Sequence, residues 1–455
     1  MMRNRMVSIV VVLFVFACSF SGCSRLLYSA MYPILHTDKG PFIPFTPLDF
    51  DFPGIESPVQ SWTYHWPEDY ERTLEAVHSP TVDEEGNIYF IGKNGYLYSL
   101  DPSGEVRWKK KGIHASIEVT KEGILAIARP DILILLDFDG NILWSKPATW
   151  AFGYDALQLS PSGYLYYNEG EYIVCLDSQG KTMWAFHNIY GRAETLLRAE
   201  RLFFDEDSNV YMVCSRSFDE KHPQYTDEEH METSLVSISS KGKFRWRQIL
   251  CKNRNYNDRF TPKDGYIQDT ILVALSTSTL NFESKNATWE EWSNDKCVQP
   301  KVIKAFNTDG EELWERTEEK PGLFDIQYSV GPNGNIVYAF NVDSYYKNHD
   351  ESIPESEYHV LSYVSKEGSD VWSHSFEHAM HTPVTFDSNG NLYVGTVSPK
   401  NKDSLYSLSS DGQIRWELKN IETAYRYAHN LVGSPSPKLY FTTENQSLLF
   451  CIGES

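Results

Sequence analysis

The sequence is poor in cysteine, and its cysteines do not follow the spacing of a metal site. Seven occur in 455 residues, and no two of them form a CxxC pair. We therefore expect no zinc or iron–sulfur framework. Cys251 and Cys297 are candidates for a disulfide bond, and the sequence leaves open whether they pair.

Positive charge is also scarce. Lys and Arg number 41 against 62 Asp and Glu, which gives a formal net charge of −21 at pH 7. This balance disfavours nucleic acids and anionic lipid surfaces as partners. It is compatible with a soluble protein or with a basic protein partner.

Catalytic motifs are missing as well. The sequence contains no GxSxG, no HExxH, no phosphate-binding glycine loop and no paired-carboxylate motif. Asp-rich turns such as Asp137–Gly140 and Asp387–Gly390 resemble fragments of calcium loops, but none completes the twelve-residue pattern. We predict a non-enzymatic protein with no cofactor and no metal.

The N-terminal apolar run, Val7 to Ala17, follows two arginines and is too short to span a bilayer. It leads into Phe20-Ser21-Gly22-Cys23, which resembles a bacterial lipoprotein signal. The resemblance predicts a signal peptide over residues 1–22 and a lipid anchor, palmitate included, at Cys23. Ser24 after that cysteine favours the outer membrane. The alternative is an ordinary secretory signal followed by an incidental cysteine.

A repeat runs through the remainder of the chain. Its signature is a Gly followed four residues later by Trp, preceded by a small polar residue and an apolar strand. Seven copies carry it: Gly104/Trp108, Gly140/Trp144, Gly180/Trp184, Gly242/Trp246, Gly310/Trp314, Gly368/Trp372 and Gly412/Trp416. Turn residues separate short strands rich in aromatic and β-branched residues, so each copy predicts a four-stranded sheet. Each Trp is expected to pack against the neighbouring sheet.

An eighth copy is split between the two ends of the chain. The C-terminus supplies strand segments at 436–443 and 447–452 and then stops without the Gly and Trp of the signature. Residues 60–66 supply the missing outer strand, which ends on Trp66. Closing a ring with strands from both termini hides the sheet edges. The sequence therefore predicts an all-β, eight-bladed β-propeller. Cys175 and Cys451 lie in matching strands and are expected in its core.

The repeats resemble those of the pyrroloquinoline-quinone-like eight-bladed β-propeller family. That family includes quinoprotein dehydrogenases and the propeller lipoprotein of the outer-membrane barrel assembly machinery. The resemblance covers roughly residues 60 to 452 and says little about function. One departure is the spacing of seven between Asp101 and Trp108, where quinoprotein repeats typically have eight and a Thr before the Gly. A quinone-dependent dehydrogenase is therefore the less favoured interpretation.

Two further segments complete the predicted organisation. Residues 23–59 contain several prolines and no sustained period, so we predict a lipidated cysteine followed by a flexible tether. Residues 60–455 form the propeller, with long insertions at about 215–234, 276–301 and 341–357. Because strands alternate in direction within a blade, these second-to-third-strand loops emerge on one face.

The insertions are acidic and aromatic, and function usually lies on such loops. The candidate partner-binding or ligand-binding residues are Tyr225, Phe282, Trp289, Trp292, Tyr345 and Tyr346. Aromatic anchors suit a protein partner or a glycan. We predict a lipid-anchored binding or scaffold protein of the bacterial cell envelope, periplasmic or surface-exposed, acting through protein–protein contacts. The alternatives are glycan or peptide-ligand binding through these loops, and loops that only pack on their own blades.

Overall fold

The computed structural model describes residues 38–455 except for 40, 68–78, 93, 129–131, 149–156, 170–171, 188–201, 218–230, 253–264, 268, 277–300, 319–322, 332–333, 343–358, 381, 398–402, 422–430 and 444–447. Within these residues, no helix is long and apolar enough to cross a membrane.

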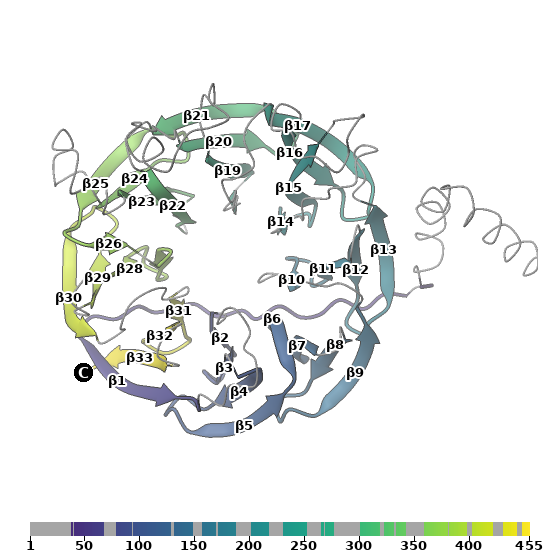
Figure 1. Cartoon of the computed structure of the whole chain (residues 1–455), viewed down its shortest axis with the longest axis horizontal. Coiled ribbons are helices and arrows are strands. Elements are labelled where there is room, and N and C mark those ends of the chain that lie inside the picture. Colours follow the sequence, from purple (N-terminus) through teal and green to yellow (C-terminus); the bar gives the residue numbers. More distant parts are fainter. Residues whose placement is uncertain are drawn as a thin grey trace, which may run out of the picture.

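The strands form eight antiparallel sheets arranged as a ring, which confirms the predicted eight-bladed propeller (Figure 1). Blades 1 to 4 are β2 (Thr81–Val82), β3 (Ile88–Ile91), β4 (Tyr96–Leu100), β5 (Val106–Lys111); β6 (Ile113–Thr120), β7 (Gly123–Ala128), β8 (Ile132–Leu136), β9 (Ile142–Pro147); β10 (Leu157–Leu159), β11 (Leu165–Glu169), β12 (Tyr172–Leu176), β13 (Thr182–His187); and β14 (Leu202–Phe204), β15 (Val210–Ser217), β16 (Met231–Ile238), β17 (Phe244–Lys252).

Blades 5 to 8 follow the same order from the ring axis outward. They are β18 (Gly265–Ile267), β19 (Thr270–Ser276), β20 (Lys301–Asn307), β21 (Glu312–Glu318); β22 (Leu323–Val330), β23 (Ile336–Val342), β24 (His359–Val364), β25 (Asp370–Ser375); β26 (Ala379–Met380) and β27 (Thr385–Phe386), β28 (Leu392–Val397), β29 (Asp403–Leu408), β30 (Ile414–Ile421); and β31 (Val432–Gly433), β32 (Lys438–Thr443), β33 (Leu448–Glu454), β1 (Pro58–His65). In blade 7 the innermost strand is split into β26 and β27, which both pair with β28.

The turn between the third and fourth strands shows why the repeat has its sequence. In blade 1, the Asp101 carboxylate accepts bonds from the backbone N–H groups of Ser103 and Glu105, at 2.8 and 3.1 Å. Gly104 follows with its N–H bonded to the Asp101 carbonyl oxygen at 3.0 Å. A short polar side chain that bonds back to its own turn fixes this geometry locally.

Each repeat Trp packs on the next blade, as the sequence predicts. The Trp108 ring lies against Gly140 of blade 2, and its indole N–H donates to the Phe138 carbonyl oxygen at 2.8 Å. The same contact joins blade 2 to blade 3, where Trp144 donates to Ser178 at 2.8 Å. Between the blades lie eight apolar clusters, one for each pair of neighbours. The core is therefore a circle of inter-blade interfaces.

The ring closes where β1 pairs with β33, as predicted, but the closing tryptophan is Trp62 and not Trp66. Trp62 pairs with Cys451, lies against Gly104 and donates to the Pro102 carbonyl oxygen at 3.3 Å. These are the contacts that the other repeat tryptophans make. Trp66 follows the strand and is buried in the cluster between blades 8 and 1. Two tryptophans four residues apart fit the repeat equally well, and the pairing register decides between them.

The predicted tether is wrong for residues 41–57. We call this segment the strap, because it lies across the ring from blade 3 to blade 7 and bonds to the turns beneath it (Figure 1). Its prolines favour an extended backbone without internal hydrogen bonds, and that backbone is free to bond to another part of the protein. Cys175 and Cys451 are buried, free thiols, as expected, whereas Cys23 and Cys297 lie outside the described residues.

Candidate functional site

The six aromatic residues that the sequence nominates for binding lie outside the described residues. They are Tyr225, Phe282, Trp289, Trp292, Tyr345 and Tyr346. The strands that flank them are described. The second strands of blades 4, 5 and 6 end at Ser217, Ser276 and Val342, and the third strands begin at Met231, Lys301 and His359. Each aromatic group therefore belongs to a second-to-third-strand connection, and their role remains a prediction.

The strap lies on the opposite face from those connections. It contacts first-to-second-strand turns, such as those of Gly163 in blade 3 and Ser388 in blade 7, and the third-to-fourth-strand turn of Asp177. Strands in a blade alternate in direction, so both kinds of turn share one face and the second-to-third-strand connections share the other. The two faces of the ring are thus chemically distinct.

Ring carbonyl, amide and carboxylate groups hold the strap backbone. The amide groups of Ser178, Lys121 and Ser388 donate to strap carbonyl oxygens at 2.7 to 3.0 Å. In the other direction, the carboxylates of Asp177, Glu122, Glu84 and Glu454 accept bonds from strap N–H groups. Charged acceptors strengthen such bonds relative to neutral ones. Several of the acidic residues of this chain therefore serve to bind a peptide backbone.

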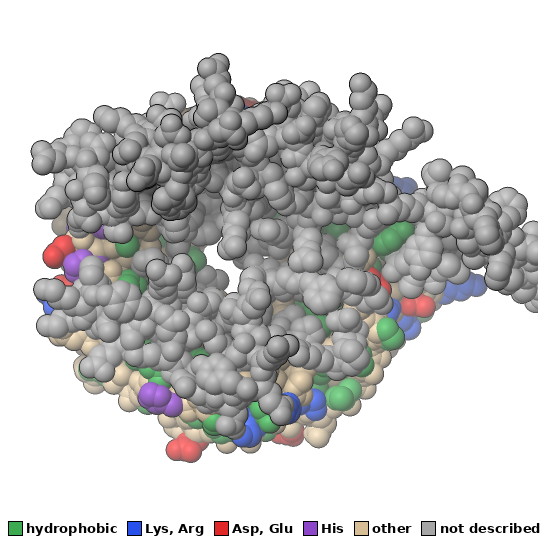
Figure 2. Space-filling view, in the orientation of Figure 1, with side chains coloured by type: hydrophobic (Ala, Val, Ile, Leu, Met, Phe, Trp, Pro, Cys, Tyr) green, Lys and Arg blue, Asp and Glu red, His purple; other side chains and the backbone are tan. Residues whose placement is uncertain are grey.

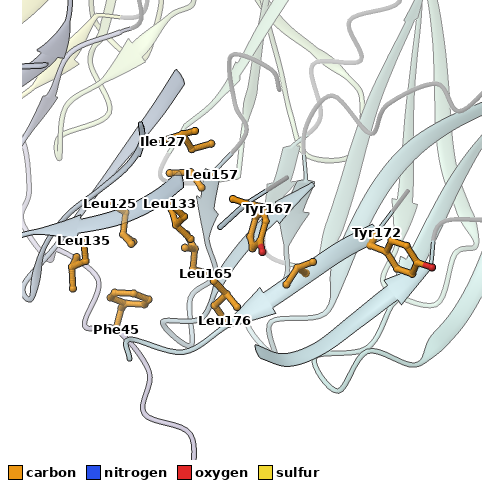
Figure 3. Close-up of a cluster of buried hydrophobic side chains, with 12 residues drawn as sticks. Phe45, Leu125, Ile127, Leu133, Leu135, Leu157, Leu165, Tyr167, Tyr172 and Leu176 are labelled. Carbon is orange, nitrogen blue, oxygen red and sulfur yellow. The ribbon is translucent and has the colours of Figure 1, made fainter. Parts of the chain in front are cut away.

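Strap side chains enter four successive inter-blade clefts. Phe45 lies in the cluster between blades 2 and 3 (Figure 3). Leu48 packs between blades 1 and 2, Phe50 between blades 8 and 1, and Phe52 between blades 7 and 8. Phe45 and Phe52 are almost fully buried, at 2% and 8% exposure. The strap thus links five consecutive blades.

Ring glycines make room for the strap. A Cβ atom at Gly433 would lie 2.4 Å from the Phe52 ring, and one at Gly163 would lie 1.8 Å from the Phe45 carbonyl oxygen. Gly433 ends the first strand of blade 8, and the corresponding residue in blade 4 is Phe204. The Phe204 ring lies 4.7 Å from the ring of Tyr166 in the preceding blade, blade 3. Phe52 lies 5.3 Å from Tyr393 in blade 7 in the same manner. The strap supplies the aromatic ring that blade 8 lacks.

A buried polar network recurs in blades 1, 4 and 7. In blade 4, Tyr211 donates to the Asp205 carboxylate at 2.7 Å, and Arg245 donates to Tyr211 at 2.8 Å and to Ser237 at 3.1 Å. The corresponding groups are Asp83, Tyr89, Ser99 and Arg107 in blade 1, and Asp387, Tyr393, Ser407 and Arg415 in blade 7.

Burial raises the pKa of Tyr393 to about 12, and burial likewise holds the pKa values of Tyr89 and Tyr211 well above their ordinary range. The phenols stay protonated and serve as donors to the carboxylates. This network is not among the features predicted from the sequence, although an Arg directly before the repeat Trp marks it in these three blades alone. With every hydroxyl bonded, the network is suited to stabilising a blade rather than to catalysis.

In blade 7 the network extends to the strap. The Ile55 N–H donates to the Tyr393 hydroxyl oxygen at 2.9 Å, and Arg415 forms an ion pair with Glu56. Trp416, the repeat Trp of blade 7, donates to the Ile55 carbonyl oxygen at 2.8 Å. In the other seven blades this acceptor belongs to the next blade's outer turn. The end of the strap therefore replaces the turn that the split eighth blade does not have.

Other surfaces offer less. A cavity of about 20 Å³ between blades 7 and 8, lined by Thr382, Thr396 and Leu405 among others, has room for about one water molecule. In the described parts of the chain, no group of three or more His, Cys, Asp or Glu side chains could hold a metal ion. Figure 2 shows acidic and basic side chains interspersed along the described part of the rim, so no single-sign patch stands out there.

No protein family model matches this sequence, and no curated protein matches it. Solved structures do resemble it. The C-terminal WD40 domain of Sif2 has 6% identity and a TM-score of 0.51, over 88% of this chain and 99% of that one. BamB from Moraxella catarrhalis has 13% identity and a TM-score of 0.48, over 87% of this chain and 97% of that one. The Dos1 propeller has 10% identity and a TM-score of 0.48, over 90% of this chain and 95% of that one. At these identities, what the comparison with Sif2 shows is the fold: this chain is an eight-bladed β-propeller.

Proposed function

We propose that this protein is a non-enzymatic, lipid-anchored binding scaffold of the bacterial cell envelope, and that it binds a protein partner on the face opposite the strap. The observation that carries the proposal is the difference between the two faces. The strap lies along five blades on one face, and the insertions of blades 4, 5 and 6 arise together on the other. Long connections on a rigid ring are suited to recognition.

The anchor part of the proposal rests on Cys23 and its signal-like surroundings. Cys23 precedes Asp38, whose N–H bonds to the Thr182 carbonyl oxygen of blade 3 at 2.8 Å, by fifteen positions. A chain of that length spans at most about 55 Å. The lipid would therefore hold the rim of blade 3 within that distance of the membrane, most naturally the outer membrane.

The test is site-specific photocrosslinking in intact envelopes. A crosslinker at Trp289 or Trp292 should capture one partner protein, whereas a crosslinker at Leu143 on the outer strand of blade 2 should not. Replacing both tryptophans by Ala should abolish the product from a crosslinker at Tyr345. Equal capture from Leu143 would refute the proposed face.

Glycan or peptide-ligand binding through the aromatic insertions is the second candidate. Tryptophan and tyrosine side chains recur in all three insertions, as Tyr225, Trp289, Trp292, Tyr345 and Tyr346. Loss of glycan-array binding in the Trp289→Ala/Trp292→Ala variant, without any crosslinked protein, would favour it over the scaffold.

A further inference from the structure

The strap is bound as a peptide ligand is bound, and not as a strand of the fold. Its one ladder contact with the described strands is an isolated bridge between Pro47 and Thr120. Its other hydrogen bonds to described residues go to turns, to side chains or to the end of β33. The strap can therefore leave the ring without breaking any sheet.

Recognition of the strap divides into two parts. Bonds from the ring to strap N–H and carbonyl groups do not depend on the strap's side chains. Binding in the clefts does depend on the strap's side chains, because the clefts hold an apolar side chain at each of positions 45, 48, 50 and 52. Peptide-binding grooves commonly use backbone bonds for affinity and pockets for specificity.

The groove is built for an occupant. Gly433 has no side chain where blades 4 and 7 have Phe204 and Phe386, and the Phe52 ring fills that position. Without Phe52, the described side chains of the ring do not complete the cleft between blades 7 and 8. A peptide that carries an aromatic residue at the position of Phe52 completes this cleft.

We propose that the strap face is a peptide-binding groove that exchanges its own strap for the strap of a second copy of this chain. The second copy offers the same residues, so the contacts of the strap before the hinge are reproduced between molecules. The strap joins β1 through Glu56 and Ser57, whose N–H groups bond to Glu454 at 2.5 and 3.0 Å. These two residues are the hinge. Exchange of an identical element is a low-cost route to a dimer. The proposal does not depend on the proposed function.

Two full-length variants test it. Phe45→Ala/Phe52→Ala has a weakened strap and an intact groove. Gly433→Leu has an intact strap and a blocked cleft, because its side chain occupies the position of the Phe52 ring. The mixture should form a one-to-one complex in sedimentation and native mass spectrometry, in which the first variant's groove holds the second variant's strap.

We expect association in the mixture to be at least about tenfold tighter than in either variant alone. An unlabelled peptide of residues 38–57 should dissolve the complex, and the same peptide with both Phe positions changed to Ala should not. Ile43→Ala, which changes an exposed strap residue, is the control for the first variant. When Ile43→Ala is mixed with Gly433→Leu, the result should be the same as when wild-type protein is mixed with Gly433→Leu. If the double variant does not fold, Phe52→Ala alone takes its place.

The absence of a complex between two folded variants, with the weakened strap open to limited proteolysis at residues 41–57, would overturn the proposal. Binding of the peptide to the first variant without complex formation would also overturn exchange between copies, and would leave the groove as a site for a different peptide.

Discussion

The glycine of each outer turn is needed for two separate reasons, and blade 7 lets them be distinguished. Gly412 has φ of 85°, and a Cβ atom there would lie 2.7 Å from the Trp372 ring. Gly390 has φ of 78°, and a Cβ atom there would meet nothing within 4 Å. Backbone conformation constrains both positions, whereas packing constrains only the first.

We therefore predict that Gly412→Ala is more damaging than Gly390→Ala. The left-handed backbone should cost each variant about 1–2 kcal/mol. Displacement of Trp372 should cost Gly412→Ala about 1–3 kcal/mol more. Urea unfolding of both variants measures the difference in the free energy of unfolding. Equal losses of stability would show that the Trp372 ring moves aside at no cost.

Tyr393 should make the stability of the protein depend on pH in the alkaline range. Its pKa is about 12 in the folded protein against an ordinary value of 10.0, with burial as the main cause. The resulting stabilisation is complete below pH 10 and is lost as the pH rises through 12. The melting temperature should fall over this window, and less steeply in Tyr393→Phe. An unchanged slope in that variant would contradict the assignment.

At the scale of the element, the strap depends on a match between Phe52 and Gly433. Phe52→Ala should leave a cavity and cost about 3–5 kcal/mol. Gly433→Val alone should also destabilise the protein, because its Cβ atom meets the Phe52 ring. Together the two changes should cost less than their sum, since each removes the other's defect. Ile43→Ala, at 47% exposure, is the control and should stay within about 0.5 kcal/mol. Additive losses in denaturant unfolding would contradict this fit.

The same pair of residues shows where the sequence stops being informative. Turn and packing signals such as Asp101, Gly104 and Trp108 act over a few residues, so the repeat and the blade count can be read from the sequence. Phe52 and Gly433 are nearly four hundred residues apart, and neither belongs to a repeated pattern. A proline-rich segment without a period therefore resembles a tether until the ring beneath it is known. The same applies to the Trp62 register, which is set by pairing with β33.

At the scale of the whole molecule, the pairing of β1 with β33 inside blade 8 differs from the other pairings of a third with a fourth strand, because it joins the two ends of the chain. In the other seven blades a short turn connects the outer strand to the third strand. In blade 8 no turn connects β1 to β33, and β1 is held by strand pairing, by Trp62 against Gly104 and by the end of the strap. If β1 separates, the long apolar edge of β33 is exposed, and such edges pair with other chains.

Trp62→Ala and Trp108→Ala should therefore lose similar stability, about 3–5 kcal/mol each, because each removes one equivalent indole from a junction. Their consequences for association should differ. Trp62→Ala loosens β1, which no turn connects to β33, whereas Trp108→Ala loosens β5, which the turn after Leu100 still connects to β4. Size-exclusion chromatography after incubation at a series of temperatures below the melting point should show oligomers of Trp62→Ala first. Oligomers of Trp108→Ala at the same temperature would mean that exposure of β33 does not limit the solubility of this propeller.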